Sequence, residues 1–191
     1  MEARAFPYKT SVVTKKQYDE HMALYKGYID KANEVAAVLA SDPRYAEANA
    51  TYSHYRGLKR GQSYALDGVI LHEQYFQNLG NEKGKPQGKA AAFLEKYFGG
   101  YDGWKDCFTA CAKSARGWCV CAYEQRSEAG MNILLDSHDD GLIATAFPVI
   151  VLDMYEHAYF TDFGTDKAAY ISRFIENIPW GVIEKRAAVV I

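Results

Sequence analysis

Residues 147–160 read FPVIVLDMYEHAYF, and this stretch indicates both how the chain folds and where its chemistry lies. Residues 147–152 form an apolar run that ends at Asp153, which is the pattern of a buried strand with a charged side chain at its exit. A buried carboxylate must be paired or must bind a metal ion. His157 follows four positions later and is a suitable second ligand. The stretch therefore predicts a carboxylate and an imidazole that bind one metal ion at the end of a core strand.

Two more histidines lie on the apolar faces of predicted helices. Thr14 is a suitable N-cap for a helix over residues 15–39, and His21 lies on the apolar stripe of that helix. His72 lies on the apolar face of a second predicted helix, over residues 62–79. Three imidazoles and one carboxylate, with no thiolate, suit iron or manganese and argue against structural zinc.

The surrounding pattern predicts an α+β fold. Two long helices with a short connection, which includes a helical piece at 46–55, should pack as an antiparallel hairpin. Turn-forming residues at 80–88 mark one linker. Beyond it we expect helices over 89–98, 101–114 and 167–177 with a last helix from 180, and strands over 118–123, 131–135 and 147–153. We therefore expect an N-terminal helical hairpin domain, 1–85, and a C-terminal α+β domain, 86–191, in which helices flank a three-stranded antiparallel sheet.

Taken alone, each proposed ligand also has a plainer interpretation. His21 is then a helix-surface histidine, His72 is a core histidine that needs a polar partner, and Asp153 with His157 is a strand-end cap. Without other evidence His138 is a solvated loop histidine. The joint pattern favours a metal site, because four of the five histidines lie near aromatic residues at strand exits, in loops or on apolar helix faces.

Composition excludes several classes of protein. The net charge is −2 and the lysines and arginines are scattered, so no basic stripe for nucleic acid is present. No apolar run reaches the about 20 residues that a membrane helix needs, and residues 1–4 lack the apolar region of a signal peptide. The chain has 15 Tyr and 9 Phe, enough to line a large aromatic cavity. We expect a cytoplasmic protein with neither a membrane nor a nucleic-acid partner.

The four cysteines lie within fifteen residues, at positions 107, 111, 119 and 121. Cys107 and Cys111 should share a helix face, and Cys119 and Cys121 a strand face. A small zinc or sulfide site is conceivable, but neither pair has the usual C-x2-C spacing. Small buried apolar cysteines in a reducing compartment are the simpler interpretation.

Four segments of the chain resemble the iron/manganese superoxide dismutase family. Residues 153–159, DMYEHAY, resemble its Asp-x-Trp-Glu-His-Ala-Tyr signature, and residues 71–76, LHEQYF, resemble its Asn-His-x-x-Phe-Tyr-Trp segment. Residues 28–33, YIDKAN, resemble its Tyr-Val-Asn-Asn-Leu-Asn segment, and residues 117–118 resemble the end of its Gly-Ser-Gly-Trp. The similarity runs from about residue 5 to residue 188.

The resemblance implies a ligand set of His21, His72, Asp153 and His157 that holds one iron or manganese ion per subunit. It also implies two catalytic residues beside the ion. Tyr28 is similar to the gateway tyrosine that relays protons at the substrate entrance, although it follows His21 by seven residues where many members have eight. His138 lies in the loop from which some classes supply the side chain that hydrogen-bonds the metal-bound solvent, and Gly68 stands where another class carries Gln.

The activity that the resemblance implies is conversion of superoxide to dioxygen and hydrogen peroxide by alternate reduction and oxidation of the metal ion. The alternative is a redox-inactive metal-binding relative of the same fold. A non-haem iron oxygenase would also use such ligands, but this chain has too few strands for the β-barrels of those enzymes. Val151 stands where manganese forms commonly have Gly, which favours iron slightly, and dual use of both metals stays open.

The resemblance further implies a homodimer, with a tetramer as a possible larger assembly. Glu156 is similar to the glutamate that contacts His157 of the partner. Departures from the family pattern are Tyr155 and Val120 for Trp, Phe160 for Tyr, and Tyr25 for His. The departures at Phe160 and Tyr25 predict an altered contact between these two residues across the interface.

Overall fold

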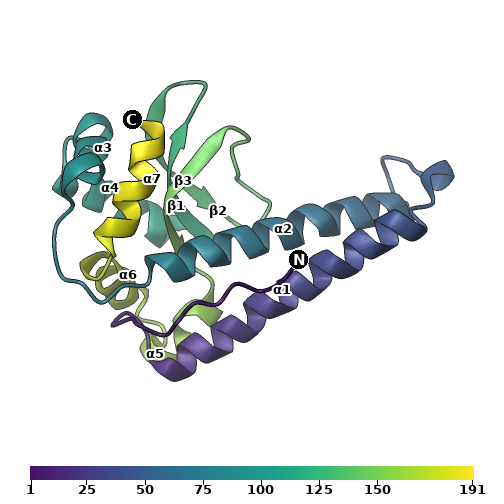
Figure 1. Ribbon diagram of the computed structural model, residues 1–191, viewed down its shortest axis with the longest axis horizontal. Helices are drawn as coiled ribbons and strands as arrows, with labels where there is room; N and C mark the ends of the chain where they lie inside the picture. The colour runs from purple at the N-terminus through teal and green to yellow at the C-terminus, as the bar shows by residue number, and fades with distance from the viewer.

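The computed structural model, which describes residues 1–191, has a long helical hairpin followed by a three-stranded sheet and further helices (Figure 1). The helices are α1 Lys15–Ser41, α2 His54–Asn78, α3 Gly88–Phe98, α4 Tyr101–Ser114, α5 Phe160–Phe163, α6 Lys167–Glu176 and α7 Trp180–Val190. The strands are β1 Trp118–Glu124, β2 Ala129–Leu135 and β3 Ala146–Asp153, and short 3-10 turns lie at Tyr45–Glu47 and Glu156–Ala158. Helices α1 and α2 lie side by side and extend away from the sheet, so the predicted α+β fold with a helical hairpin is confirmed.

Helix α1 begins at the predicted cap. The Thr14 side chain accepts a hydrogen bond from the backbone N–H of Gln17 (3.3 Å). The Asp162 carboxylate in turn accepts from the Thr14 N–H (2.5 Å) and hydroxyl (2.6 Å). The start of α1, two turns before His21, is therefore fastened to the segment that follows the 147–160 stretch.

Helix α2 begins earlier than predicted. Ser53 caps it by accepting from the backbone N–H of Arg56 (3.1 Å), so Gly57 and Gly61 lie inside the helix. A glycine in a helix costs about 1 kcal/mol relative to alanine, and packing against α1 together with the Ser53 cap overrides that cost. The expected helix at 46–55 is wrong, because only the 3-10 turn over 45–47 is helical before the cap.

The sheet has strand order β2-β1-β3, and both strand pairs are antiparallel. The register between β1 and β3 shifts next to Pro148, which lacks an N–H and lies on an edge strand, where such a residue is tolerated. The Asn78 side chain at the end of α2 accepts a hydrogen bond from the Val151 N–H (2.7 Å). This bond fixes the helix that carries His72 against the strand that carries Asp153.

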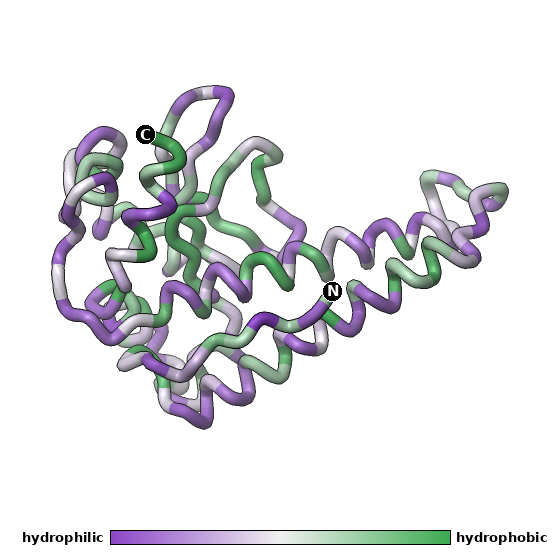
Figure 2. The backbone as a smooth tube through the Cα atoms, in the orientation of Figure 1, coloured by the Kyte–Doolittle hydropathy of each residue, from purple (hydrophilic) through white to green (hydrophobic).

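The core lies between the sheet and the helices around it. The strands are the most continuous hydrophobic segments of the backbone, whereas the far end of the hairpin is mixed (Figure 2). Residues 118–122 of β1 and 149–152 of β3 are buried throughout, which agrees with the apolar run that marks β3 in the sequence. Asp153 therefore sits at the end of a fully buried strand, as its pattern predicts.

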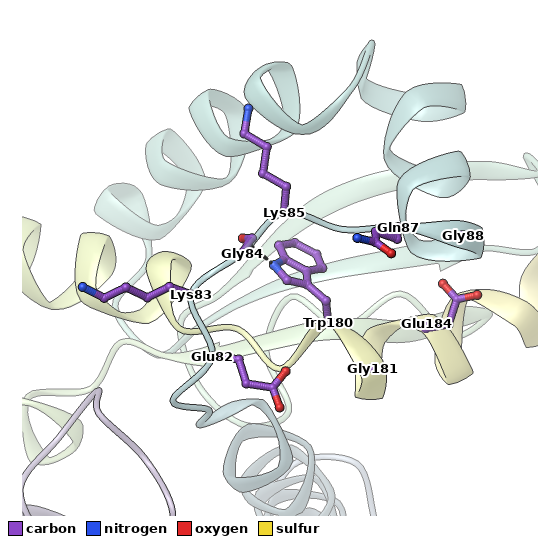
Figure 3. Close-up of a pocket in the computed structure, with 9 residues that line it drawn as sticks. All are labelled: Glu82, Lys83, Gly84, Lys85, Gln87, Gly88, Trp180, Gly181 and Glu184. Atoms are coloured by element: carbon purple, nitrogen blue, oxygen red, sulfur yellow. Dashed lines mark hydrogen bonds between the residues drawn. The ribbon is translucent and has the colours of Figure 1, made fainter.

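The linker between the hairpin and α3 packs against the start of α7 around a cavity of about 490 Å³ (Figure 3). The Trp180 indole N–H donates to the Gly84 carbonyl (3.1 Å). The Glu184 carboxylate accepts from the backbone N–H groups of Lys89 (2.9 Å) and Ala90 (2.8 Å) and so caps α3. These hydrogen bonds hold the linker against α7 and α3.

The cysteines divide between buried and accessible positions. Cys119 and Cys121 on β1 are fully buried, which confirms the prediction for this pair. Cys111 is partly buried and Cys107 is exposed, so the prediction of a buried side chain is wrong for Cys107. The buried stripe of α4 consists of Trp104, Phe108 and Ala112, and Cys107 with Cys111 lies on its flank.

Candidate metal centre

The predicted ligands from four separate elements come together. His21 lies on α1, His72 on α2, Asp153 at the end of β3 and His157 in the 3-10 turn that follows. Their ligand atoms lie within 4.8 Å of one another. Asp153 Oδ2 is 3.1 Å from Nε2 of His21, 3.3 Å from Nε2 of His157 and 3.8 Å from Nε2 of His72. His21 therefore lies next to the carboxylate.

The donor atoms of this cluster have no hydrogen-bond partner within the chain. Nε2 of His21, His72 and His157 and Oδ2 of Asp153 are all buried and unpaired. A buried polar atom without a partner is costly and normally rare. Four such atoms that converge on one point fit a cation, and their chemistry suits iron or manganese.

The other polar atoms of the ligands are held in place. His72 Nδ1 is 2.6 Å from the Gly68 carbonyl oxygen and donates its proton there, which leaves the lone pair on Nε2. Asp153 Oδ1 accepts from the Tyr155 N–H (2.9 Å), which leaves Oδ2 free. Such outer contacts fix ring orientation and tautomer in metal sites.

Burial sets the charge of the cluster. Loss of solvation lowers the pKa of His72 to about 3 and also lowers the pKa of His21. Burial raises the pKa of Asp153, but the adjacent imidazoles of His157 and His21 outweigh burial, and the pKa is lowered overall. At neutral pH the buried part of the site therefore combines neutral imidazoles with one carboxylate, which is the protonation state that binds metal.

His138 lies beside the cluster as a fully buried imidazole. The Trp118 indole N–H can only donate, and it donates to His138 Nδ1 (2.9 Å). The neutral ring therefore carries its proton on Nε2, and this buried Nε2–H has no partner. Loss of solvation lowers the pKa of His138 to about 4, so the ring stays neutral at pH 7. His138 can therefore donate a hydrogen bond from Nε2 to a group bound at the site. Its ring centroid lies 5.6 Å from that of His72.

Tyr28 packs against His138 with ring centroids 4.6 Å apart, in spite of its shortened step from His21. Gly68 makes this contact possible, because a Cβ there would lie 3.0 Å from the Tyr28 ring and 3.3 Å from His138 Cδ2. Burial and the neighbouring Tyr64 raise the pKa of Tyr28, whose hydroxyl therefore stays protonated.

Tyr64 is a neighbour of the site that the sequence analysis missed. Its ring centroid lies 4.6 Å from that of His138. The available signal was spacing, since Tyr64, Gly68 and His72 follow one another at intervals of four on one face of α2.

The departures from the family pattern alter the packing around the ligands. Tyr155, in the position of the signature Trp, stacks on His157 with centroids 5.2 Å apart. Tyr25 is fully buried, and its hydroxyl donates to Glu73 (2.8 Å) and accepts from the Arg4 N–H (2.9 Å). Tyr25 is thus held within its own chain and is not available for a contact with Phe160 of the partner subunit. The exposed apolar residue of this part of α1 is Leu24.

The metal-depleted protein is expected to become less stable as the pH falls from 7 to 5. The unfolded chain takes up protons on histidine below pH 6.5, whereas folded His72 stays neutral down to about pH 3. Through His72 the free energy of unfolding should fall by at most about 1.4 kcal/mol per pH unit, a slope approached only below pH 6.5. His138 and His21, whose pKa values are also lowered, add to this fall. Asp153 contributes only below its unfolded pKa of about 3.9, outside this range.

Urea titrations of metal-depleted protein at pH 7, 6 and 5 measure this slope. His138→Gln serves as a control, because it removes one of these histidine contributions and should flatten the dependence. An unfolding free energy that is constant between pH 7 and 5 would contradict the assignment of neutral buried imidazoles.

Comparison with known proteins agrees with the geometry of the site. The family model described as iron/manganese superoxide dismutases, C-terminal domain, matches residues 86–186. An iron superoxide dismutase of Aquifex aeolicus is 35% identical over 185 residues, 94% of this chain and 86% of the relative. An iron superoxide dismutase of Cupriavidus metallidurans is 36% identical over 159 residues, 82% and 78% of the two chains. A manganese superoxide dismutase of Haloferax volcanii is 30% identical over 175 residues, 91% and 84% of the two chains. The chain belongs to the iron/manganese superoxide dismutase family.

Proposed function

We propose that this protein is a superoxide dismutase, with His21, His72, Asp153 and His157 as the ligands of one iron or manganese ion. The observation that carries the proposal is the convergence of four buried, unpaired donor atoms beside the equally unpaired Nε2–H of His138. These four side chains would hold the ion, which would supply one-electron redox chemistry for superoxide. The overall reaction joins two superoxide ions and two protons to give dioxygen and hydrogen peroxide.

The chain itself supplies protons and orientation. Formation of hydrogen peroxide needs two protons, and His138 holds one at Nε2 while Tyr28 holds one at its hydroxyl. Both groups are protonated at these atoms at neutral pH, for the reasons of burial and tautomer given above. The Trp118 indole fixes the His138 ring so that the same nitrogen keeps its proton.

Aromatic side chains limit what can reach the ligands. The ring centroid of Trp118 lies 5.0 Å from that of His72, and Tyr155 covers His157. We propose that these aromatic rings keep anions larger than superoxide away from the ligands. Attraction of a small anion must be local because the net charge is −2. Arg116 and Lys167 line a cavity of about 480 Å³ next to Tyr155 and His157 and supply that positive charge.

The protein uses iron, manganese or both. Val151 favours iron slightly, because manganese forms of the family commonly have Gly at this position. The rival proposal is a metal-binding relative without redox turnover. Retention of the His138 donor and of Tyr28 favours turnover, because a storage site needs no proton donor beside its ligands.

Stopped-flow decay of superoxide, with hydrogen peroxide measured in the same sample, tests the proposed activity. Metal-loaded protein should accelerate the decay and yield one peroxide for every two superoxide ions consumed. Metal-loaded protein that leaves the spontaneous decay rate unchanged would support the inactive relative.

We also propose a homodimer in which Glu156 contacts His157 of the partner. A surface cavity of about 410 Å³ is lined by residues from α1 and from the segment after β3, namely Glu20, Leu24, Glu156, His157, Phe160 and Thr161. Leu24 is 43% exposed and Phe160 is 50% exposed, and the His157 side chain is 29% exposed. A metal-bound histidine normally donates its second N–H to a carboxylate or carbonyl. The partly exposed ring of His157 fits a glutamate from the partner subunit.

Glu156→Ala is expected to weaken the dimer and to reduce metal retention together, because it removes the carboxylate proposed to hold His157. Sedimentation velocity at micromolar protein, with elemental analysis of the same fractions, measures both quantities. Glu20→Ala is the matched control, since it removes an acidic side chain of the same cavity without the proposed contact. A Glu156→Ala protein with unchanged mass and metal content would refute this arrangement.

Two further proposals concern organisation and location. We propose the domains 1–85 and 86–191, which is supported by the linker at 80–88 and by the start of the family C-terminal domain match at residue 86. None of the helices is long and apolar enough to cross a membrane. The four unbridged cysteines fit the proposed cytoplasmic location, where thiols are kept reduced.

A further inference from the structure

Arg186 on α7 is a buried cation whose hydrogen bonds reach both helix α2 and strand β3. The residue is only 8% exposed. Its Nη1 donates to the Val149 carbonyl (3.0 Å) and to Asn78 Oδ1 (3.3 Å). Its Nη2 donates to the side-chain oxygen of Gln77 (2.8 Å) and to the Gln74 carbonyl (3.3 Å). One guanidinium therefore spans from the end of α2 to the outer edge of β3.

The guanidinium is held by neutral oxygens alone. None of its four acceptors carries a charge, and Arg186 takes part in none of the ion pairs of the chain. A cation removed from water without an anionic partner is costly. The partial negative charge at the C-terminal end of α2 offsets part of that cost. A methionine of similar length would fill the same space without the cost, so packing alone does not explain an arginine here.

On β3, the hydrogen bonds occupy the edge that no other strand covers. β3 is an edge strand of the sheet. Its Val149 carbonyl accepts from Arg186, and its Val151 N–H donates to Asn78 Oδ1 (2.7 Å). Asn78 Oδ1 thus accepts from both the strand and the guanidinium, which fixes the amide orientation, since only its oxygen can accept. Val151 lies two residues before the ligand Asp153, so the network holds the part of the strand that leads into the metal centre.

On α2, the hydrogen bonds occupy the turns that follow the ligand His72. Gln74 lies two residues after His72, and Asn78 lies six residues after it, at the last position of the helix. Hydrogen bonds in a buried network hold their partners in one arrangement, because the low dielectric makes each bond costly to break. α7 packs against both α2 and β3, and so brings Arg186 to the place where the two elements meet (Figure 1).

We propose that Arg186 is a positioning residue of the metal centre, which holds α2 and β3 at the separation where His72 and Asp153 bind one ion. Its hydrogen bonds go to none of the four ligands, so it acts through Asn78 and through the backbone of the two elements. This role rests on the proposed function, which identifies the ligands and the ion.

Arg186→Met tests the role, because it removes the charge and all four hydrogen bonds and keeps a side chain of similar length. Protein loaded with manganese(II) under anaerobic conditions is mixed with excess EDTA, and release of the ion is followed. Release should be about 10-fold faster from the variant, the low end of the loss in metal affinity when an outer partner of a ligand is removed. The EPR spectrum of bound manganese(II), which reports the arrangement of its ligands, should change as well.

Ile183→Ala is the matched control on the same helix. Ile183 is fully buried, and its apolar side chain makes no hydrogen bond, so truncation destabilises the fold without breaking the network. Urea unfolding measures the stability of both variants. The control should keep the release rate and the EPR spectrum of the wild type. Equal release from Arg186→Met and Ile183→Ala, with unchanged EPR spectra, would overturn the positioning role.

Arg186→Lys keeps the charge but donates from a single nitrogen, which cannot span α2 and β3 as the planar fork of arginine does. Its release rate should lie above that of the wild type and below that of Arg186→Met. This variant keeps the test decisive if Arg186→Met does not fold. A lysine variant with the release rate and EPR spectrum of the wild type would show that the span is not needed, and would overturn the role.

Superoxide decay is measured on the same samples, so that the two proposals can fail separately. If wild-type protein binds manganese(II) and does not accelerate the decay, the proposed dismutation is refuted, and release and EPR still decide the role of Arg186. If wild-type protein binds neither manganese(II) nor iron(II), both proposals are wrong.

Discussion

Asp153→Ala is expected to abolish metal binding and superoxide turnover together. Asp153 is the only carboxylate of the cluster, and its Oδ2 lies within 3.8 Å of Nε2 of all three histidines. Loss of an outer partner of a metal ligand typically costs about 10- to 100-fold in affinity, and loss of the one anionic ligand should cost more. Elemental analysis of the purified variant after extensive dialysis measures the metal, and superoxide decay measures turnover.

Asp153→Asn removes the negative charge of the side chain but keeps nearly the same size and shape. Its amide oxygen can still accept from the Tyr155 N–H, as Asp153 Oδ1 does, so the backbone after β3 should keep its conformation. Metal affinity should still fall, because three neutral imidazoles no longer face a negative charge. Either variant that retained wild-type metal content through dialysis would contradict the ligand assignment.

His138→Ala is expected to lower turnover by about 10- to 100-fold while the metal stays bound. The substitution removes the proton at Nε2 but none of the four ligands. It also leaves the buried Trp118 indole N–H without an acceptor, which should destabilise the fold by about 1–3 kcal/mol. Superoxide decay normalised to bound metal measures the first effect, and urea unfolding measures the second.

His138→Gln is the conservative comparison. Its amide offers an N–H donor to the site and a carbonyl oxygen to Trp118, so turnover and stability should both recover in part relative to alanine. If the alanine variant keeps full turnover per bound metal ion, the donor role of His138 is wrong.

The sequence predicted those parts of the site that depend on local pattern. An apolar run that ends in Asp153 indicated the buried strand, and spacing placed His21 and His72 on apolar helix faces. The resemblance added Tyr28 and His138, which no local pattern distinguished from ordinary residues. In the structure all of these residues lie around one point.

Other features depend on contacts between distant elements and could not be predicted from local pattern. The tautomer of the loop residue His138 is set by Trp118 on β1, twenty residues away. Helix α2 begins at His54 and not at the predicted residue 62, and packing against α1 sustains it across Gly57 and Gly61. The exposure of Cys107 depends on which flank of α4 meets the sheet. In each case a neighbour from elsewhere in the chain decides the outcome.

Reconstitution of metal-depleted protein with increasing iron or manganese tests the proposed centre most directly. At each step, bound metal is measured by elemental analysis and superoxide turnover by stopped flow. If His21, His72, Asp153 and His157 hold one catalytic ion, turnover rises linearly with bound iron or manganese up to one ion per chain, and the more effective metal is identified. Full occupancy without turnover, or turnover that does not depend on bound metal, would contradict the proposed dismutase.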